Sequence, residues 1–124
     1  MIKPLLTLAL LALSGIASVQ APSATTAREI ASLFAALEAS GCEFNRNGAW
    51  YDAFKASEHL QRKYDYLVKK HAAGSAETFI ALAASESSMT GQPYKVRCPG
   101  KEAVDSRAWF QNQLLEYRTA KGHP

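Results

Sequence analysis

The sequence predicts a mainly α-helical fold: a small single domain of about four helices with one irregular or short extended segment, Ser85 to Gly100. Three observations support this fold class. Four stretches of the chain repeat apolar residues at intervals of three and four, which places them on one face of a helix. The segment Ser85 to Gly100 breaks that pattern. The chain after residue 21 has about 103 residues, which suffices for one compact domain and no more.

The first 21 residues have the organisation of a secretory signal peptide. One cation, Lys3, precedes an apolar run at 5–13. Small residues suited to a signal peptidase follow: Ser14, Gly15, Ala17 and Ser18. This order is typical of an export signal, and the apolar run is too short to span a hydrocarbon layer of about 30 Å. An uncleaved N-terminal anchor is the alternative.

Cleavage of this signal defines the mature protein. We expect the cut after Ala17, Ser18 or Ala21, which leaves a single helical domain at 22–124 with a frayed C-terminal tail. Such a protein would be periplasmic and would have no stable membrane span after cleavage. Loss of Lys3 lowers the formal net charge from +3 to +2. Because the remaining cations are mixed with acids along the chain, we predict no nucleic-acid partner.

Two cysteines, Cys42 and Cys98, lie in the mature chain. In an exported protein an even pair predicts a disulfide, and this one would close a loop of about 57 residues and contribute about 4 kcal/mol. Free thiols or a metal pair are the alternatives. His59 and His71 would point about 120° apart on one helix, and no zinc-type spacing of Cys or His occurs. We therefore predict no metal and no cofactor.

The first helix is predicted at 26–41. Thr26 and Glu29 have the spacing of a capping box, and Gly41 can end the helix in the left-handed conformation. An apolar stripe at helical spacing connects them: Ile30, Leu33, Phe34 and Leu37. Asn47-Gly48 then indicates a tight turn, and we expect Phe44 to pack inward while Arg46 and Asn47 shape this loop.

The second helix is predicted from near Asp52 to near His71. Its inner face would consist of Ala53, Ala56, Leu60, Tyr64 and Leu67. Glu58 and Arg62, four residues apart, can form an ion pair on its outer face. Trp50 and Tyr51 precede it, either as an exposed anchor for a partner or packed against neighbouring residues.

Two shorter predictions complete the helices. Ser75 would cap a helix with Glu77 in its first turn and with Phe79, Ile80 and Ala83 buried. The last helix would begin near Asp105 and bury one apolar face: Trp109, Phe110, Leu114 and Tyr117.

The irregular segment begins where the third helix ends. Its serines compete for backbone hydrogen bonds and do not favour a helix, and Pro93 favours extended geometry at Gln92. The run from Tyr94 to Arg97 suits a short extended segment, which Pro99-Gly100 would end. If Cys42 binds Cys98, this segment lies beside the loop that follows the first helix.

Four pieces of the sequence together resemble one family. They are "FNRNG" at 44–48, "HL" at 59–60, "AETFI" at 76–80 and "ASESSMTGQPYKV" at 84–96. Their order and spacing are similar to those of the YfeK-like family of small exported bacterial proteins, a domain of unknown function, over nearly the whole mature chain. The resemblance implies a largely helical periplasmic protein with no assigned activity or cofactor. The cysteine pair is not part of what the family implies.

Catalytic motifs receive little support from the residues. Ser85, Ser87 and Ser88 could supply a nucleophile with His59 as its base, but "SESSMTG" has neither the Gly-x-Ser-x-Gly nor the Ser-x-x-Lys spacing. The alternative is that these hydroxyls form hydrogen bonds with backbone groups where the third helix ends. The carboxylates are scattered over helix starts and outer faces, so no pair indicates a glycosidase.

A binding patch is the stronger candidate site. His59 and Lys63 lie one turn apart on one helix face, and Arg46, Tyr94 and Arg97 would come from the two segments that the disulfide joins. Such a patch could bind a carboxylate of a cell-wall peptide or an acidic loop of a partner. The alternative is structural: Arg46 bonded to backbone carbonyls, His59 half-buried and Tyr94 in the core.

The sequence therefore predicts a non-catalytic binding or accessory module whose partner is a periplasmic protein or a cell-envelope component. The second hypothesis is a small cell-envelope hydrolase that uses His59 with a nearby serine. A third is a structural or stress-related protein with no defined site.

Overall fold

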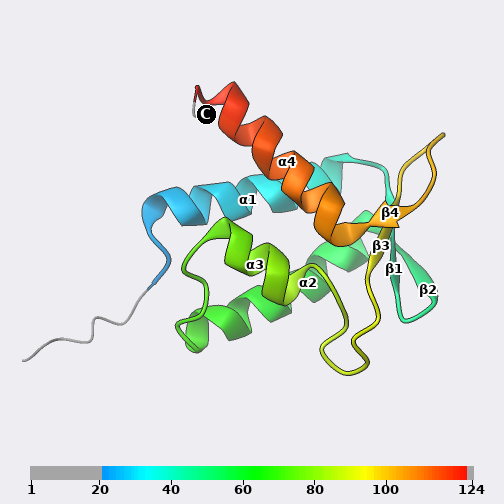
Figure 1. The fold of residues 1–124 in the computed structure, drawn as a ribbon, viewed down its shortest axis with the longest axis horizontal. Coiled ribbons are helices and arrows are strands. Elements are labelled where there is room, and N and C mark those ends of the chain that lie inside the picture. Colours follow the sequence, from blue (N-terminus) through cyan, green and yellow to red (C-terminus); the bar gives the residue numbers. More distant parts are fainter. Residues whose placement is uncertain (1–20, 123–124) are drawn as a thin grey trace, which may run out of the picture.

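The computed structural model describes residues 21–122, and Figure 1 shows their arrangement. The signal peptide predicted at 1–21 lies outside the described residues except for Ala21. The elements follow one another as α1 (Ala24–Ala39), β1 (Glu43–Arg46), β2 (Ala49–Asp52), α2 (Ala53–Lys69), α3 (Ala76–Ala83), β3 (Lys95–Arg97), β4 (Val104–Asp105) and α4 (Ser106–Ala120).

The predicted fold class is wrong in one respect, because a sheet accompanies the four helices. The described residues contain a four-stranded antiparallel sheet in the order β2-β1-β3-β4. The strands lie together at one end of the molecule, and the helices extend away from them (Figure 1). The protein is therefore a helix-rich α/β domain, and the prediction of a mainly α fold with a single irregular segment is corrected.

The hairpin β1–β2 replaces the loop that the sequence predicted between the first two helices. Asn47 and Gly48 have φ of 51° and 87°, so both central residues of the turn are left-handed. This geometry is that of a type I′ turn, whose twist matches two antiparallel strands. Asn47-Gly48 thus joins two strands in register, with Arg46 opposite Ala49.

The irregular segment contains the third strand. β3 pairs antiparallel with β1, with Val96 opposite Phe44, and it also pairs with β4. The predicted extended run is thus part of a sheet because two neighbours satisfy its backbone groups. Before β3, the hydroxyl of Ser85 donates to the carbonyl of Ile80 at 2.6 Å, as expected for a serine at a helix end.

The helix termini agree with the sequence except at the first. Ser23 caps α1, and its hydroxyl accepts from the amide of Thr26 at 3.1 Å, so the capping box expected at Thr26 is wrong by one turn. Gly41 does follow the C-terminus of α1 with φ of 67°. Asp52 and Ser75 cap α2 and α3 through their side chains. Asp105 precedes α4 as predicted.

The core lies between the helices and the inner face of the sheet. Its largest fully buried side chains are Tyr94, Phe44, Phe79, Phe110, Ile30, Leu33, Leu37, Leu60, Ile80 and Val96. The predicted inner residues of the helices contribute most of them. Tyr64, Trp109 and Tyr117, which were also expected there, are half-buried.

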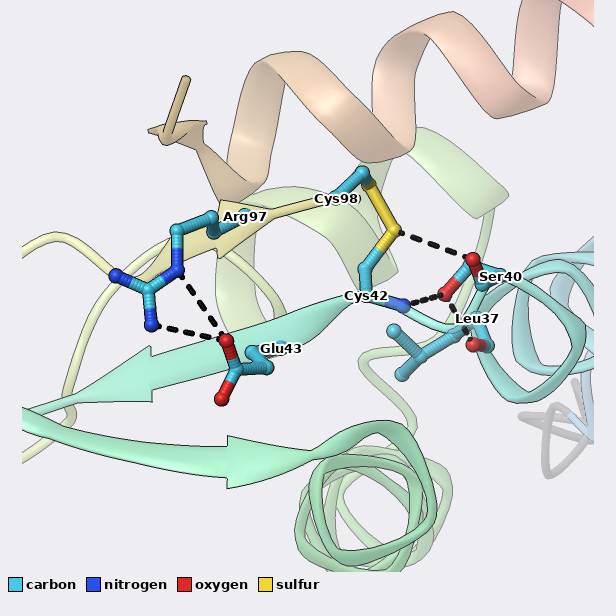
Figure 2. The surroundings of a disulfide bond; sticks show 6 residues. All are labelled: Leu37, Ser40, Cys42, Glu43, Arg97 and Cys98. Atoms are coloured by element: carbon cyan, nitrogen blue, oxygen red, sulfur yellow. Dashed lines mark hydrogen bonds and ion pairs between the residues drawn. A yellow bond between two sulfur atoms is a disulfide. The ribbon is translucent and has the colours of Figure 1, made fainter. Parts of the chain in front are cut away.

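The predicted disulfide between Cys42 and Cys98 is present. Figure 2 shows it between the turn after α1 and the end of β3, with the two Cα atoms 4.1 Å apart. Ser40 orders this turn, because its hydroxyl donates to the carbonyl of Leu37 at 2.6 Å and accepts from the amide of Cys42 at 3.0 Å. The bond thus joins the end of a helix to a central strand across 56 residues of sequence.

Arg118 joins α4 to α1 and α3. From α4 its guanidinium binds both carboxylate oxygens of Glu29 on α1 and both of Glu77 on α3, at 2.7–3.1 Å. The hydrogen bonds to the two carboxylates, together with their negative charge, raise the pKa of Arg118. The hydrogen bond from Arg118 and its positive charge lower the pKa of Glu77. No spacing in the sequence indicated this cluster.

Candidate functional site

Four of the five predicted patch residues form one hydrogen-bonded chain. Arg46 Nη1 lies 2.5 Å from His59 Nδ1, and His59 Nε2 lies 3.1 Å from the hydroxyl of Tyr94. Lys63 Nζ donates to the same hydroxyl at 3.1 Å. The structure therefore brings Arg46, His59, Lys63 and Tyr94 together, although Tyr94 is buried and its hydroxyl is engaged by two neighbours.

Local structure explains why these four side chains meet. Alternation along β1 places Arg46 on the same face as the buried Phe44, which is the face turned toward α2. His59 and Lys63 lie four residues apart on α2 and therefore project from one side of that helix. Tyr94 leads into β3, and its ring packs on Phe44 with centroids 5.0 Å apart.

The hydrogen bonds fix the tautomer of His59. A guanidinium has only donors, so Nδ1 of His59 must accept from Arg46. The ring proton is then on Nε2, which donates to the oxygen of Tyr94. Lys63 donates to that oxygen and also to the carbonyl of Glu86 at 3.1 Å. These hydrogen bonds thus hold a neutral imidazole between two cations, Arg46 and Lys63.

Burial and charge keep His59 neutral. Burial, together with the cations of Arg46, Lys63 and Arg62, lowers the pKa of His59 from 6.5 to about 4. Burial also lowers the pKa of Lys63, although the carboxylate of Glu86 opposes that effect, and it raises the pKa of the Tyr94 hydroxyl. No carboxylate takes part in the described hydrogen bonds that join Arg46, His59, Tyr94 and Lys63.

Arg97 does not join the other four. It lies opposite Glu43 in the β1–β3 register and therefore on the outer face of the sheet. Its guanidinium pairs with the carboxylate of Glu43 at 2.9 Å and stacks 3.9 Å above the ring of Trp50. Figure 2 shows the two hydrogen bonds to Glu43. The predicted patch is thus divided between the two faces of the sheet.

Trp50 and Tyr51 are accordingly packed against neighbours rather than free. Both are half-buried on β2, and their side chains point to opposite faces of the sheet. Trp50 lies under Arg97, and the ring of Tyr51 lies 5.0 Å from the guanidinium carbon of Arg46. The alternative of an exposed aromatic anchor receives no support from this arrangement.

A basic pocket of about 290 Å³ opens beside Arg46 and His59. Its lining is Phe44, Arg46, Tyr51, Lys55, Ala56, Glu58, His59 and Arg62. Three cations therefore face one carboxylate. The ion pair predicted between Glu58 and Arg62 is not among the salt bridges of residues 21–122, and neither Arg46 nor Lys55 has an acidic partner there. The predicted patch contained neither Lys55 nor Arg62, although their spacing from His59 along the helix could have indicated them.

A second, more apolar pocket of about 560 Å³ shares two wall residues with the first. Its lining is His59, Arg62, Lys63, Tyr66, Leu67, Leu82 and Ser88. Tyr66 and Leu82 are 59% and 53% exposed, so apolar surface is open to solvent next to two cations. His59 and Arg62 belong to both pockets and form the boundary between them.

Comparison with known proteins yields a family. The model of a family of unknown function, DUF5329, matches residues 24–118. The chain belongs to the DUF5329 family. The match extends from the first residue of α1 to Arg118, and it includes both cysteines and the whole Arg46–His59–Tyr94–Lys63 chain. No curated protein and no solved structure matches the chain. The YfeK-like name and the export of this DUF5329 protein stay predictions.

The serines of this DUF5329 domain have structural partners. The hydroxyl of Ser87 accepts from Asn47 Nδ2 and from the amides of Met89 and Thr90, each at 3.3 Å. Ser85 donates to a helix-end carbonyl, as described above. Ser88 lines the apolar pocket with His59, but both ring nitrogens of His59 are already engaged. Within residues 21–122 no serine is hydrogen-bonded to His59, so the geometry gives the hydrolase hypothesis no support.

Between residues 21 and 122, no three or more His, Cys, Asp or Glu side chains gather in a way that could hold a metal ion. Over the same residues, none of the helices has both the length and the apolarity needed to cross a bilayer.

Proposed function

We propose that this DUF5329 protein is an exported, periplasmic binding or accessory module that binds an anionic group in the basic pocket and catalyses no reaction. The observation that supports this most directly is the meeting of Arg46, Lys55 and Arg62 at one cavity that has a single carboxylate in its wall. Cations without acidic partners attract an anion, and a guanidinium can bind a carboxylate through two parallel hydrogen bonds.

The state of His59 favours binding over catalysis. A general base needs a free nitrogen within reach of the proton that it removes. In this protein Arg46 occupies one nitrogen and Tyr94 the other. A pKa near 4 also makes the imidazole a weak base. The hydrogen bond to His59 also holds Arg46 in a fixed position at the pocket wall. Less side-chain entropy is therefore lost when a ligand binds.

Two features support the export part of the proposal. The Cys42–Cys98 disulfide is the kind of bond that forms in the periplasm and is rare in reducing compartments. The sequence of the first 21 residues has the order of an export signal. A partner that carries carboxylates, such as a cell-wall peptide or an acidic protein loop, matches both the location and the charge of the pocket.

Titration of the oxidised protein with acetate and with inorganic phosphate, followed by two-dimensional NMR, tests the proposal. We expect saturable shifts at the amides of 55–62 that weaken as salt is raised, because exposed charges are screened. Arg62→Ala should weaken binding about tenfold or more, since a charge-assisted hydrogen bond is worth about 1.5–3 kcal/mol. Lys69→Ala is the matched control, because it removes an exposed cation of α2 that does not line the pocket.

Two results would contradict the proposal. One is a lack of saturable shifts with either anion. The other is equal weakening in the Arg62→Ala and Lys69→Ala proteins, which would indicate attraction to the overall charge and not to this pocket.

A further inference from the structure

The two pockets lie along one continuous face of α2. Four residues of α2 line the first pocket at positions i, i+3, i+4 and i+7, which share one side of a helix: Lys55, Glu58, His59 and Arg62. His59, Arg62, Lys63, Tyr66 and Leu67 continue the same face in the second. From Lys55 to Tyr66 this face extends about 16 Å at 1.5 Å per residue.

The chemistry of this face changes along its length. The basic pocket takes two cations from this face, Lys55 and Arg62, and a third, Arg46, from β1. Toward the C-terminal end of the face, Tyr66 and Leu67 line the apolar pocket together with Leu82 of α3. Figure 1 shows α2 and α3 as neighbouring helices, and a loop follows α3 and leads to β3. Arg62 and Lys63 both line the apolar pocket, and Arg62 also lines the basic pocket. A ligand that matches both halves has an anionic end and an apolar end.

We propose, on the basis of the function proposed above, that the ligand is a monomeric amphiphilic organic acid. Its carboxylate binds among Arg46, Lys55 and Arg62. Its apolar chain passes His59 and Arg62 and lies in the second pocket between Tyr66, Leu67 and Leu82.

Charge and burial both support this ligand class. An inorganic anion would use the basic pocket and leave the exposed apolar surface of Tyr66 and Leu82 in water. A neutral apolar molecule would leave the cations without a partner. Pockets of about 290 and 560 Å³ are also of the size that accommodates small organic molecules. An acid with a hydrocarbon chain satisfies the two halves together.

A series of straight-chain alkanoates from acetate to decanoate tests the inference. Each acid would be titrated into the oxidised protein below its micelle concentration, with binding followed by two-dimensional NMR. We expect the affinity to rise up to about fourfold per added methylene group, the limit for full burial at about 0.8 kcal/mol. The shifts should extend from residues 55–62 to residues 63–67 and to Leu82 as the chain lengthens.

Substitution of one exposed leucine separates the two halves of the site. Leu82→Gln removes apolar surface from the second pocket without adding a charge beside Arg62, and it should abolish the dependence on chain length. Leu115→Gln is the matched control, because Leu115 is 58% exposed on α4 and lines neither pocket. It should retain the full dependence on chain length.

The outcomes distinguish this inference from the proposed function. If acetate and decanoate bind equally well, the apolar half is wrong and the anion site stands. If octanol binds as well as octanoate, or if acids bind only above the micelle concentration, the amphiphilic-acid inference is overturned. If no acid of any length gives saturable shifts, the proposed anion-binding function is overturned as well.

Discussion

Arg46 of β1 donates a hydrogen bond to Nδ1 of His59 on α2, at 2.5 Å, and this bond joins the sheet to the longest helix of the described residues. Because a guanidinium does not lose its proton, the bond can form only while Nδ1 of His59 is unprotonated. The bond therefore connects the protonation of one imidazole to the contact between two elements.

The first prediction concerns the pH dependence of stability. His59 has a pKa of about 4 in the folded protein and 6.5 as its ordinary value. Below pH 6.5 the unfolded chain binds a proton that the folded protein does not bind, so stability falls as the pH decreases toward 4. For a partly exposed group we expect a loss of about 1–2 kcal/mol after screening by solvent. Urea unfolding at several pH values measures it.

Two variants isolate the contribution of His59. His59→Gln should lose less stability than the parent protein between pH 6.5 and pH 4. His71→Asn is the control: His71 is exposed with φ of 56°, a conformation that asparagine tolerates, and this variant should behave like the parent. An unchanged pH dependence in His59→Gln would mean that His59 is not the group responsible.

The second prediction concerns the hydroxyl of Tyr94. Tyr94→Phe removes the oxygen that accepts from both His59 and Lys63 while the buried ring stays in place. We expect a loss of about 1–2 kcal/mol, since two donors lose their acceptor and water replaces only part of it. Thermal unfolding measures the loss. Tyr66→Phe removes a hydroxyl from an exposed ring and should cost almost nothing; equal losses in the two variants would disprove the role of the Tyr94 oxygen.

The third prediction concerns the disulfide. Its reduction, or the double substitution of Cys42 and Cys98 by alanine, should lower the free energy of unfolding by about 2–4 kcal/mol, because the unfolded chain regains the entropy of a loop closed across 56 residues. Urea titration of the oxidised and reduced protein measures the difference. The double-alanine protein should show no response to reductant. A loss below about 1 kcal/mol would mean that the reduced unfolded chain is already compact.

The fourth prediction concerns Arg118, which is 28% exposed and binds Glu29, a side chain that is 12% exposed. Arg118→Ala leaves Glu29 largely buried without its cation and should cost about 1–3 kcal/mol. Arg118→Lys should recover less than half of that, since an ammonium cannot form the two planar pairs. Arg107→Ala, on the exposed face of the same helix, is the control for thermal unfolding. Full recovery by lysine would show that charge alone matters.

The helices could be predicted because their information is local. Apolar residues at intervals of three and four determine which face of a helix is buried. Capping residues determine where a helix begins, as Ser75 and Asp52 do for α3 and α2. Leu60, Phe79 and Phe110 are buried as their spacing predicted. The disulfide is present as predicted. The match to a family of unknown function agrees with the coarser part of the predicted resemblance, and the YfeK-like name stays a prediction.

The sheet could not be predicted in the same way. Its strands have two to four residues each, too few for an alternation to be distinguished from a loop. Asn47-Gly48 is the one local signal of a hairpin, because this dipeptide is preferred in type I′ turns. The dipeptide predicts a turn, but it does not by itself predict the strands on either side. The pairing of β1 with β3 joins segments about 50 residues apart. The predicted disulfide implied that the two segments lie side by side, but tertiary packing determines that they pair as strands and in which register.

The candidate site shows the same division. The spacing of His59 and Lys63 places both side chains on one helix face, because helical periodicity is a local property. The contact of Arg46 with His59 and the position of Arg97 on the other face of the sheet depend on strand pairing, because the side-chain period of two assigns each strand residue to a face once the pairing is known. Tertiary packing also added Lys55 and Arg62 to the site, since a pocket is formed by surfaces from several elements and no single segment contains it.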